Sequence, residues 1–224
     1  MTTTTTTARA RARALEGLAH ADPSVRLRAA LAVGSDPAPG SVGPLVERCA
    51  TEPDFSVREM LTWALTRHTP AATVPALLPE LRSARGQARS QALHTLSKIG
   101  DRAAWPAITP ALLADPDDEV ARAAWRAAVV LVPEGAEPAL AVGLAAQLGR
   151  GPRETRLSLS RALIALGDAA RPALDAAADH ADPEVRAHAL ATEVLRRDPE
   201  AGFEFAVEEA KRIVALGGED REGR

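Results

Sequence analysis

The sequence predicts an all-helical protein built from repeated two-helix units. Its composition is 46% hydrophobic but only 3% aromatic, and such Ala- and Leu-rich chains suit close helix packing better than β-sheets. The stretch ADPSVR at 21–26 recurs as ADPEVR at 181–186. Apolar residues after these stretches follow helical spacing. We therefore expect an all-α, right-handed α-α superhelix of about six two-helix repeats plus a C-terminal capping helix.

Two independent registers define the repeat. A Val-Arg pair or its equivalent recurs every 30 to 35 residues, at Val25-Arg26, Val57-Arg58, Ala88-Arg89, Val120 with Arg122, Thr155-Arg156 and Val185-Arg186. Prolines recur 31 to 34 residues apart, at Pro44, Pro75, Pro106, Pro138 and Pro172. Self-similarity at a fixed period of this length is typical of stacked repeat proteins.

Each repeat contains two predicted helices. The first has about ten residues and starts near a proline, which is favoured at the first helical position. The second has about fifteen residues and starts after an aspartate, since Asp22 and Asp182 each stand directly before a proline and can cap a helix. Gly34, Gly100 and Gly167 are ordinary helix-ending residues.

The repeats form one predicted domain. Each repeat can bury its apolar face only against its neighbours, so the ends of the stack need covering. We expect a disordered Thr tail over 1–7, a solenoid over 8–198, a capping helix over 199–217 and a disordered tail over 218–224. The expected repeats are about 8–36, 41–69, 72–101, 104–133, 136–168 and 169–198.

The repeats resemble HEAT repeats, especially the short type called PBS-lyase-like. The resemblance covers residues 12–198 and rests on the period, the proline of the first helix and the Asp-x-x-x-Arg of the second. It implies a ladder of Asp and Arg side chains between neighbouring repeats, interrupted where Arg85 and Pro152 replace the aspartate. The implied ladder residues are Asp22, Arg26, Asp54, Arg58, Arg89, Arg156, Asp182 and Arg186.

Charge and cysteine content restrict the functional classes. The formal net charge of −3 and pI near 6.0 disfavour general attraction to nucleic acid or an anionic membrane. Cys49 is the one cysteine, so no intramolecular disulfide can form and no thiolate cluster is offered to zinc. No run of 18 apolar residues is present. We expect a cytoplasmic monomer without membrane contact.

Candidate binding residues lie on the second helices, six positions after the Val register. That position points away from the helix-packing face. Trp63 there resembles an interface hot spot, although its ring can instead pack into the core. The predicted partner-binding residues are Trp63, His94, Arg126 and Arg161, bordered by Glu59, Ser90 and Arg122.

The sequence offers little for catalysis. It has no phosphate loop, nucleophile elbow or dinucleotide fingerprint, and its histidines lack metal-ligand spacing. We predict no catalytic residue, metal or cofactor, and a non-enzymatic scaffold that binds another protein, with an acidic surface favoured over a phosphate backbone. The resemblance leaves two enzymatic alternatives, a DNA glycosylase using Glu59, Trp63 and Trp105, and a bilin lyase-like accessory protein.

Overall fold

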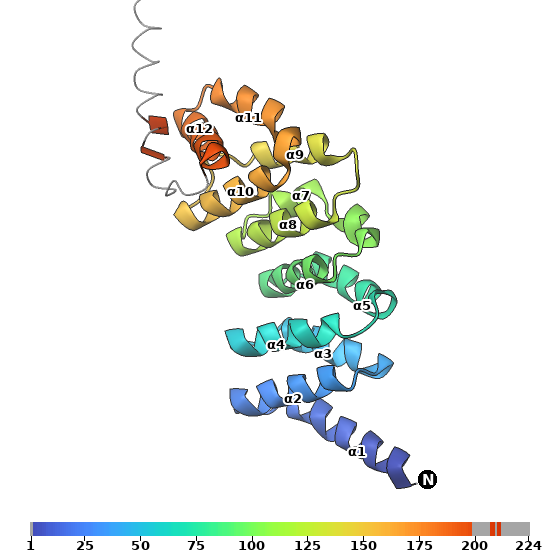
Figure 1. The fold of residues 1–224 in the computed structure, drawn as a ribbon. Coiled ribbons are helices and arrows are strands. Elements are labelled where there is room, and N and C mark those ends of the chain that lie inside the picture. Colours follow the sequence, from blue (N-terminus) through green and yellow to red (C-terminus); the bar gives the residue numbers. More distant parts are fainter. Residues whose placement is uncertain (1, 199–206, 209, 212–224) are drawn as a thin grey trace, which may run out of the picture. The chain divides into compact units, whose positions relative to one another are not determined.

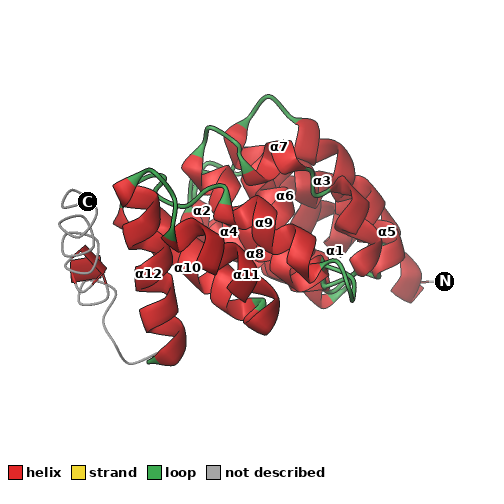
Figure 2. Ribbon diagram, turned by 90° about the horizontal axis from the view of Figure 1, so that it is seen from above, coloured by secondary structure: helices red, strands yellow, loops and turns green. Residues whose placement is uncertain are grey.

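The computed structural model of the chain describes residues 2–198, 207–208 and 210–211. This described part consists of helices and loops, as Figure 2 shows, and contains no strand. The predicted all-helical repeat fold is therefore confirmed. The chain divides into two compact units, Met1–Ile108 and Thr109–Arg224.

Unit 1 is two layers of helices. The second helices of the repeats, α2, α4 and α6, pack side by side, and the first helices α3 and α5 lie beside them in the other layer (Figure 1). The elements of this unit are α1 (Thr2–Gly17), α2 (Pro23–Ser35), η1 (Pro39–Ser41), α3 (Val42–Cys49), α4 (Phe55–Thr66), α5 (Pro70–Leu77), η2 (Leu78–Arg82), α6 (Gly86–Ile99) and η3 (Arg102–Ala107).

Unit 2 repeats this arrangement. Its second helices α8, α10 and α12 pack in sequence, and the first helices α7, α9 and α11 contact one another in the same order. The elements of this unit are α7 (Pro110–Leu113), α8 (Asp118–Leu131), α9 (Glu137–Ala145), α10 (Arg153–Ala165), η4 (Gly167–Ala170), α11 (Arg171–Ala178) and α12 (Pro183–Arg197).

Capping carboxylates begin the second helices, as expected. Asp22 accepts a hydrogen bond from the amide of Ser24, Asp54 from that of Val57, and Asp182 from that of Glu184. Each bond satisfies a backbone N–H that the first helical turn leaves without a partner. The helices α6 and α10, whose N-cap residues are Arg85 and Pro152, have no such side-chain cap.

Of the repeating prolines, Pro138 and Pro172 lie at the starts of α9 and α11 as expected, whereas Pro44 and Pro75 lie farther into their helices. Pro75 lies inside α5, five residues after its start at Pro70, and Pro44 is the third residue of α3. Proline inside a helix removes one backbone hydrogen bond and crowds the preceding turn. Accordingly the chain changes to the 3₁₀ segment η2 soon after Pro75.

The ends of the chain depart in part from the expected tails. The helix α1 begins at Thr2, within the segment 1–7 predicted as disordered, because extending an existing helix costs far less than starting one. Most of the predicted capping helix 199–217 and all of the tail 218–224 lie outside the described residues. Of the described residues there, Ala210 is buried in a cluster with Ala187, Ala191 and Leu195 of α12.

Candidate functional site

The second-helix layer of unit 1 carries an exposed tryptophan held in place by a glycine. Trp63 of α4 is 37% exposed, so part of its side chain is packed against the protein and part is accessible to solvent. A Cβ built on Gly34 of α2 would come within 2.5 Å of Cζ3 of Trp63, which places the six-membered ring directly against that glycine. The absence of a side chain at Gly34 therefore lets the indole pack across the α2–α4 contact.

Leu31 extends this surface on α2. It occupies the same register position on α2 as Trp63 on α4, one helical turn before Gly34, and is 45% exposed. Exposed apolar side chains are common singly, but two at equivalent positions of packed helices form a patch. We call Leu31, Gly34 and Trp63 the Leu31–Trp63 platform.

Three other predicted residues of unit 1 lie on α4 and α6, with Glu59 on α4 and Ser90 and His94 on α6. Oε1 of Glu59 is 3.3 Å from Nε2 of His94, across the contact between α4 and α6. Ser90 donates a hydrogen bond from Oγ to the carbonyl of Gln87 at 3.1 Å, within its own helix. Glu59 therefore reaches toward α6, whereas Trp63 packs against α2.

Unit 2 holds the remaining predicted binding residues. Arg126 of α8 and Arg161 of α10 are both exposed, and they occupy the same register position on adjacent helices. Arg122 is half-buried and donates to Glu119 at 2.9 Å. The predicted row thus divides, with Trp63 and His94 in unit 1 and the arginines in unit 2.

The three tryptophans differ in burial. Trp125 is fully buried and its Nε1 donates to the carbonyl of Leu113 at 2.8 Å. Trp105 is half-buried within the 3₁₀ segment η3. Of these three tryptophans only Trp63 is exposed, while Phe55 at the start of α4 is an exposed aromatic residue as well.

The Asp and Arg residues of the implied ladder make contacts that differ from the Asp–Arg pairing between repeats that the resemblance implies. Its aspartates cap their own helices, as described above. Its arginines clamp the loops that precede their own helices: Arg26 donates to the carbonyls of His20 and Ala21, and Arg186 does the same to His180 and Ala181. Arg58, Arg89 and Arg156 also donate to carbonyls five or six residues earlier.

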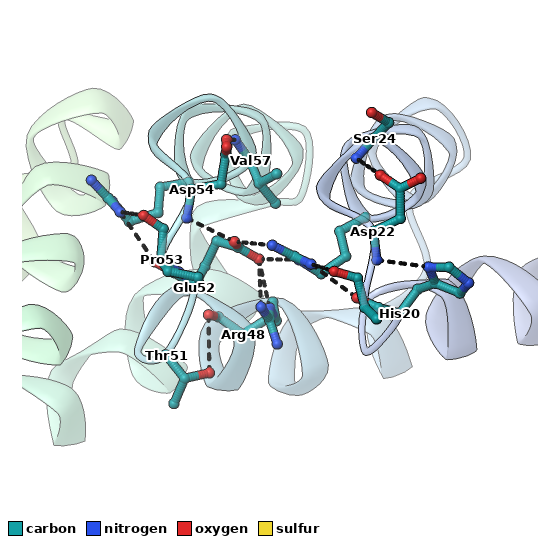
Figure 3. Close-up of polar contacts among 12 residues, drawn as sticks. His20, Asp22, Ser24, Arg48, Thr51, Glu52, Pro53, Asp54 and Val57 are labelled. Atoms are coloured by element: carbon teal, nitrogen blue, oxygen red, sulfur yellow. Dashed lines mark hydrogen bonds and ion pairs between the residues drawn. The ribbon is translucent and has the colours of Figure 1, made fainter.

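The contact between neighbouring repeats of unit 1 passes through Glu52, which sequence analysis missed. This carboxylate is fully buried. It accepts two hydrogen bonds of 2.7 Å from Arg26, one of 2.7 Å from Arg48 and one of 2.9 Å from the amide of Asp54, and Figure 3 shows the last two. A buried charge needs such pairing.

The charge on Glu52 is strongly stabilised by these contacts. Burial by itself would raise the pKa of this carboxyl, but hydrogen bonds from Arg26, the amide of Asp54 and Arg48 outweigh it and lower the pKa to about 2. Gln87 continues the connection toward the next repeat, because its Nε2 donates to the carbonyls of Cys49 and Glu52. Glu52 is therefore a structural carboxylate with no lone pair directed to a ligand.

In unit 2, Asp118 and His188 make the polar contacts between neighbouring repeats. Asp118 accepts from Arg150 at 2.8 Å and from Oγ1 of Thr155 at 3.2 Å. His188 is buried, and its Nδ1 accepts from the amide of Gly149 while Nε2 lies 3.0 Å from the carbonyl of Arg156. A carbonyl can only accept, so Nε2 carries the proton and the ring is neutral. Burial lowers the pKa of His188 to about 4.

No signal in the sequence marks these residues individually. Glu52 stands two positions before the capping Asp54, and His188 stands two after Arg186. Glutamate and histidine also occupy exposed positions elsewhere in the chain, so residue type alone does not distinguish these two. Their roles depend on neighbouring repeats, which lie 26 to 39 residues away along the chain.

Other features of the described residues concern metals, membranes and grooves. Across 2–198 and the four further residues, no three His, Cys, Asp or Glu side chains are grouped to hold a metal ion. None of the described helices combines the length and apolar character needed to cross a membrane. Between α9 and α11 lies an apolar groove of about 500 Å³ that includes Val142 and Leu148. Cys49 is buried, and burial raises the pKa of its thiol to about 12.

Comparison with known proteins identifies the repeats. A family model described as HEAT repeats matches residues 42–129, so the repeats in this part of the chain are similar to HEAT repeats. None of the curated proteins matches the sequence. Among solved structures, the chain is similar to human deoxyhypusine hydroxylase in complex with glycerol, at 20% identity and a TM-score of 0.48, over 95% of this chain and 96% of that one.

This comparison contradicts the predicted function. The similar structure is that of a hydroxylase, an enzyme, so the predictions of a non-enzymatic scaffold and of no enzymatic activity are wrong as inferences from the HEAT-repeat fold. The family match and the similar structure name neither a DNA glycosylase nor a bilin lyase. With this identity and TM-score, the hydroxylase assigns no activity, substrate or ligand to the present chain.

Proposed function

We propose that the chain binds a segment of another protein on the Leu31–Trp63 platform of unit 1. The observation that carries the proposal is the placement of Trp63, whose ring rests on Gly34 and yet remains 37% exposed. An aromatic side chain held in one orientation before binding loses little conformational freedom when a partner covers it. Tryptophan is also enriched among residues that dominate binding energy.

The charges beside the platform favour an acidic partner. Arg67 follows Trp63 by one helical turn, is exposed, and forms no ion pair with a described residue. Glu59, one turn before Trp63, already faces His94. A partner that places an apolar side chain on Trp63 and a carboxylate beside Arg67 therefore fits this surface. The proposal concerns binding only, and it covers a protein substrate as well as a protein partner. It includes a cytoplasmic location, which the single cysteine favours.

Peptide selection tests the proposal with defined ligands. Peptides enriched on the whole chain from a displayed random library are expected to carry one large apolar side chain flanked by Asp or Glu. Substituting Trp63→Ala should weaken them at least about tenfold, which corresponds to about 1.4 kcal/mol, because the apolar contact is lost. Affinities are measured by fluorescence anisotropy with labelled peptides.

Two further variants complete the design. Leu31→Ser alters the platform without touching the indole and should also weaken the peptides. Val142→Ala truncates a more exposed apolar side chain, 64% exposed and located on α9, and should leave affinity unchanged. Circular dichroism verifies that each variant is folded. The proposal fails if the peptides bind the Trp63→Ala chain as tightly as the wild type, or if none is enriched on the wild type over that variant.

A further inference from the structure

Two arginines on α8 and α10 of unit 2 have no acidic partner among the described residues. Arg126 and Arg161 are exposed and form no ion pair or side-chain hydrogen bond with a described residue. Elsewhere in this unit ion pairs neutralise most arginines. These pairs are Arg122–Glu119, Arg150–Asp118, Arg153–Glu154, Arg156–Glu184, Arg196–Glu193 and Arg197–Glu193.

The two arginines share one surface. They occupy equivalent positions on the packed helices α8 and α10, and Arg122 lies one turn before Arg126 on α8. The Nε of Arg122 is buried and has no hydrogen-bond acceptor among the described residues. The surface therefore presents three guanidinium groups, with more N–H donors than the chain supplies acceptors. We call Arg122, Arg126 and Arg161 the arginine cluster.

The positive charge of this cluster is incompletely compensated. Partial desolvation and the neighbouring Arg122 both lower the pKa of Arg126, and Glu119 offsets this only in part. A lowered arginine pKa means that the local environment disfavours the cation relative to water. An incoming anion would relieve this unfavourable energy, and guanidinium groups match carboxylates with two parallel hydrogen bonds.

We infer that the arginine cluster binds an acidic polypeptide segment, with carboxylates on Arg126 and Arg161. Val130, which is 46% exposed and one turn after Arg126, offers an apolar contact beside the charges. A polypeptide fits better than a nucleic acid for two reasons. Proteins that bind a phosphate backbone use more positive charges than these three arginines beside Glu119 provide, and the chain as a whole is acidic. This site is separate from the Leu31–Trp63 platform and goes beyond the function proposed for it.

Binding of a labelled oligoglutamate peptide to the whole chain tests the inference. Anisotropy at low ionic strength should show binding that weakens as salt is added, because exposed charges are screened. The double variant Arg126→Glu and Arg161→Glu should bind at least about tenfold more weakly, since two attractive contacts become repulsive. Trp63→Ala should leave oligoglutamate binding unchanged, which separates this site from the proposed platform.

A charge-matched control excludes a general effect of net charge. Arg102→Glu with Arg171→Glu changes the formal charge equally at two exposed arginines outside α8 and α10, and should retain binding. Equal loss in both double variants would overturn the inference. It would also be overturned if oligoglutamine bound as well as oligoglutamate, or if duplex DNA or a phosphorylated peptide of equal charge bound more tightly than oligoglutamate.

Discussion

At the scale of single residues, the polar groups buried between repeats are the most constrained part of the protein. Glu52 is fully buried, and every hydrogen bond it accepts comes from Arg26, Arg48 or the amide of Asp54. A buried ion pair contributes modest net stability, but removing one member leaves the other charge without compensation. Residues of this kind therefore determine which arrangement of repeats is tolerated.

The substitution Glu52→Gln tests this role. It should lower the melting temperature by several degrees, because the buried guanidinium of Arg26 would lose its anionic partner. Thermal unfolding followed by circular dichroism measures the change. Glu47→Gln is the matched control, since Glu47 is exposed on α3, the helix that precedes the loop with Glu52, and should have little effect. Equal melting temperatures for the two variants would contradict a structural role for Glu52.

At the scale of elements, the contact between α2 and α4 depends on one glycine. Gly34 is buried, and a Cβ there would lie 2.5 Å from the ring of Trp63 and 2.8 Å from Cα of Ala64. Contacts that short force the neighbouring groups to move, and one of these groups is backbone. The absence of a side chain at Gly34 therefore permits both the close approach of the two helices and the orientation of Trp63.

Gly34→Ala should consequently destabilise unit 1 and weaken any ligand of the Leu31–Trp63 platform. The overpacking cost of about 1–3 kcal/mol exceeds the gain of up to about 1 kcal/mol in helix propensity. Urea unfolding gives the stability change. Gly43→Ala in α3 is the control, because no atom lies within 4 Å of the added Cβ, and it should be neutral or stabilising. Greater stability of the Gly34→Ala chain would refute this account of the contact.

At the scale of the whole molecule, the largest acid-linked pKa shifts of the two units belong to different groups, His188 in unit 2 and Glu52 in unit 1, while burial also lowers the pKa of His68 in unit 1. The folded-state pKa of His188 is about 4, below the ordinary value of 6.5. The unfolded state therefore binds more protons, and unit 2 loses stability as pH falls from about 6.5 to 4. The pKa of Glu52 is about 2, below the ordinary 4.5, so its contribution to unit 1 is lost as pH falls from about 4.5 to 2.

Acidification should therefore weaken unit 2 before unit 1. Between pH 6.5 and 4 the linked loss in unit 2 is about 3 kcal/mol, from about 1.4 kcal/mol per pKa unit. Hydrogen exchange with mass spectrometry, resolved by peptide, should show faster exchange in α10 and α12 near pH 4.5 while α2 and α4 stay protected, after correction for intrinsic exchange rates. His188→Gln should flatten this pH dependence. Earlier loss of protection in unit 1 would show that other groups dominate.

What the sequence alone determined was the series of helices and their repeat. Asp22, Asp54 and Asp182 cap helices, and Gly100 ends one in the left-handed conformation, because capping and chain reversal depend on neighbouring residues. The tertiary structure decided which side chains pair and which stay exposed. Glu52, His188 and Gly34 acquire their roles from partners in adjacent repeats, and Arg126 and Arg161 from the absence of such partners among the described residues. Those relations depend on contacts 26 or more residues apart, which a local pattern cannot encode.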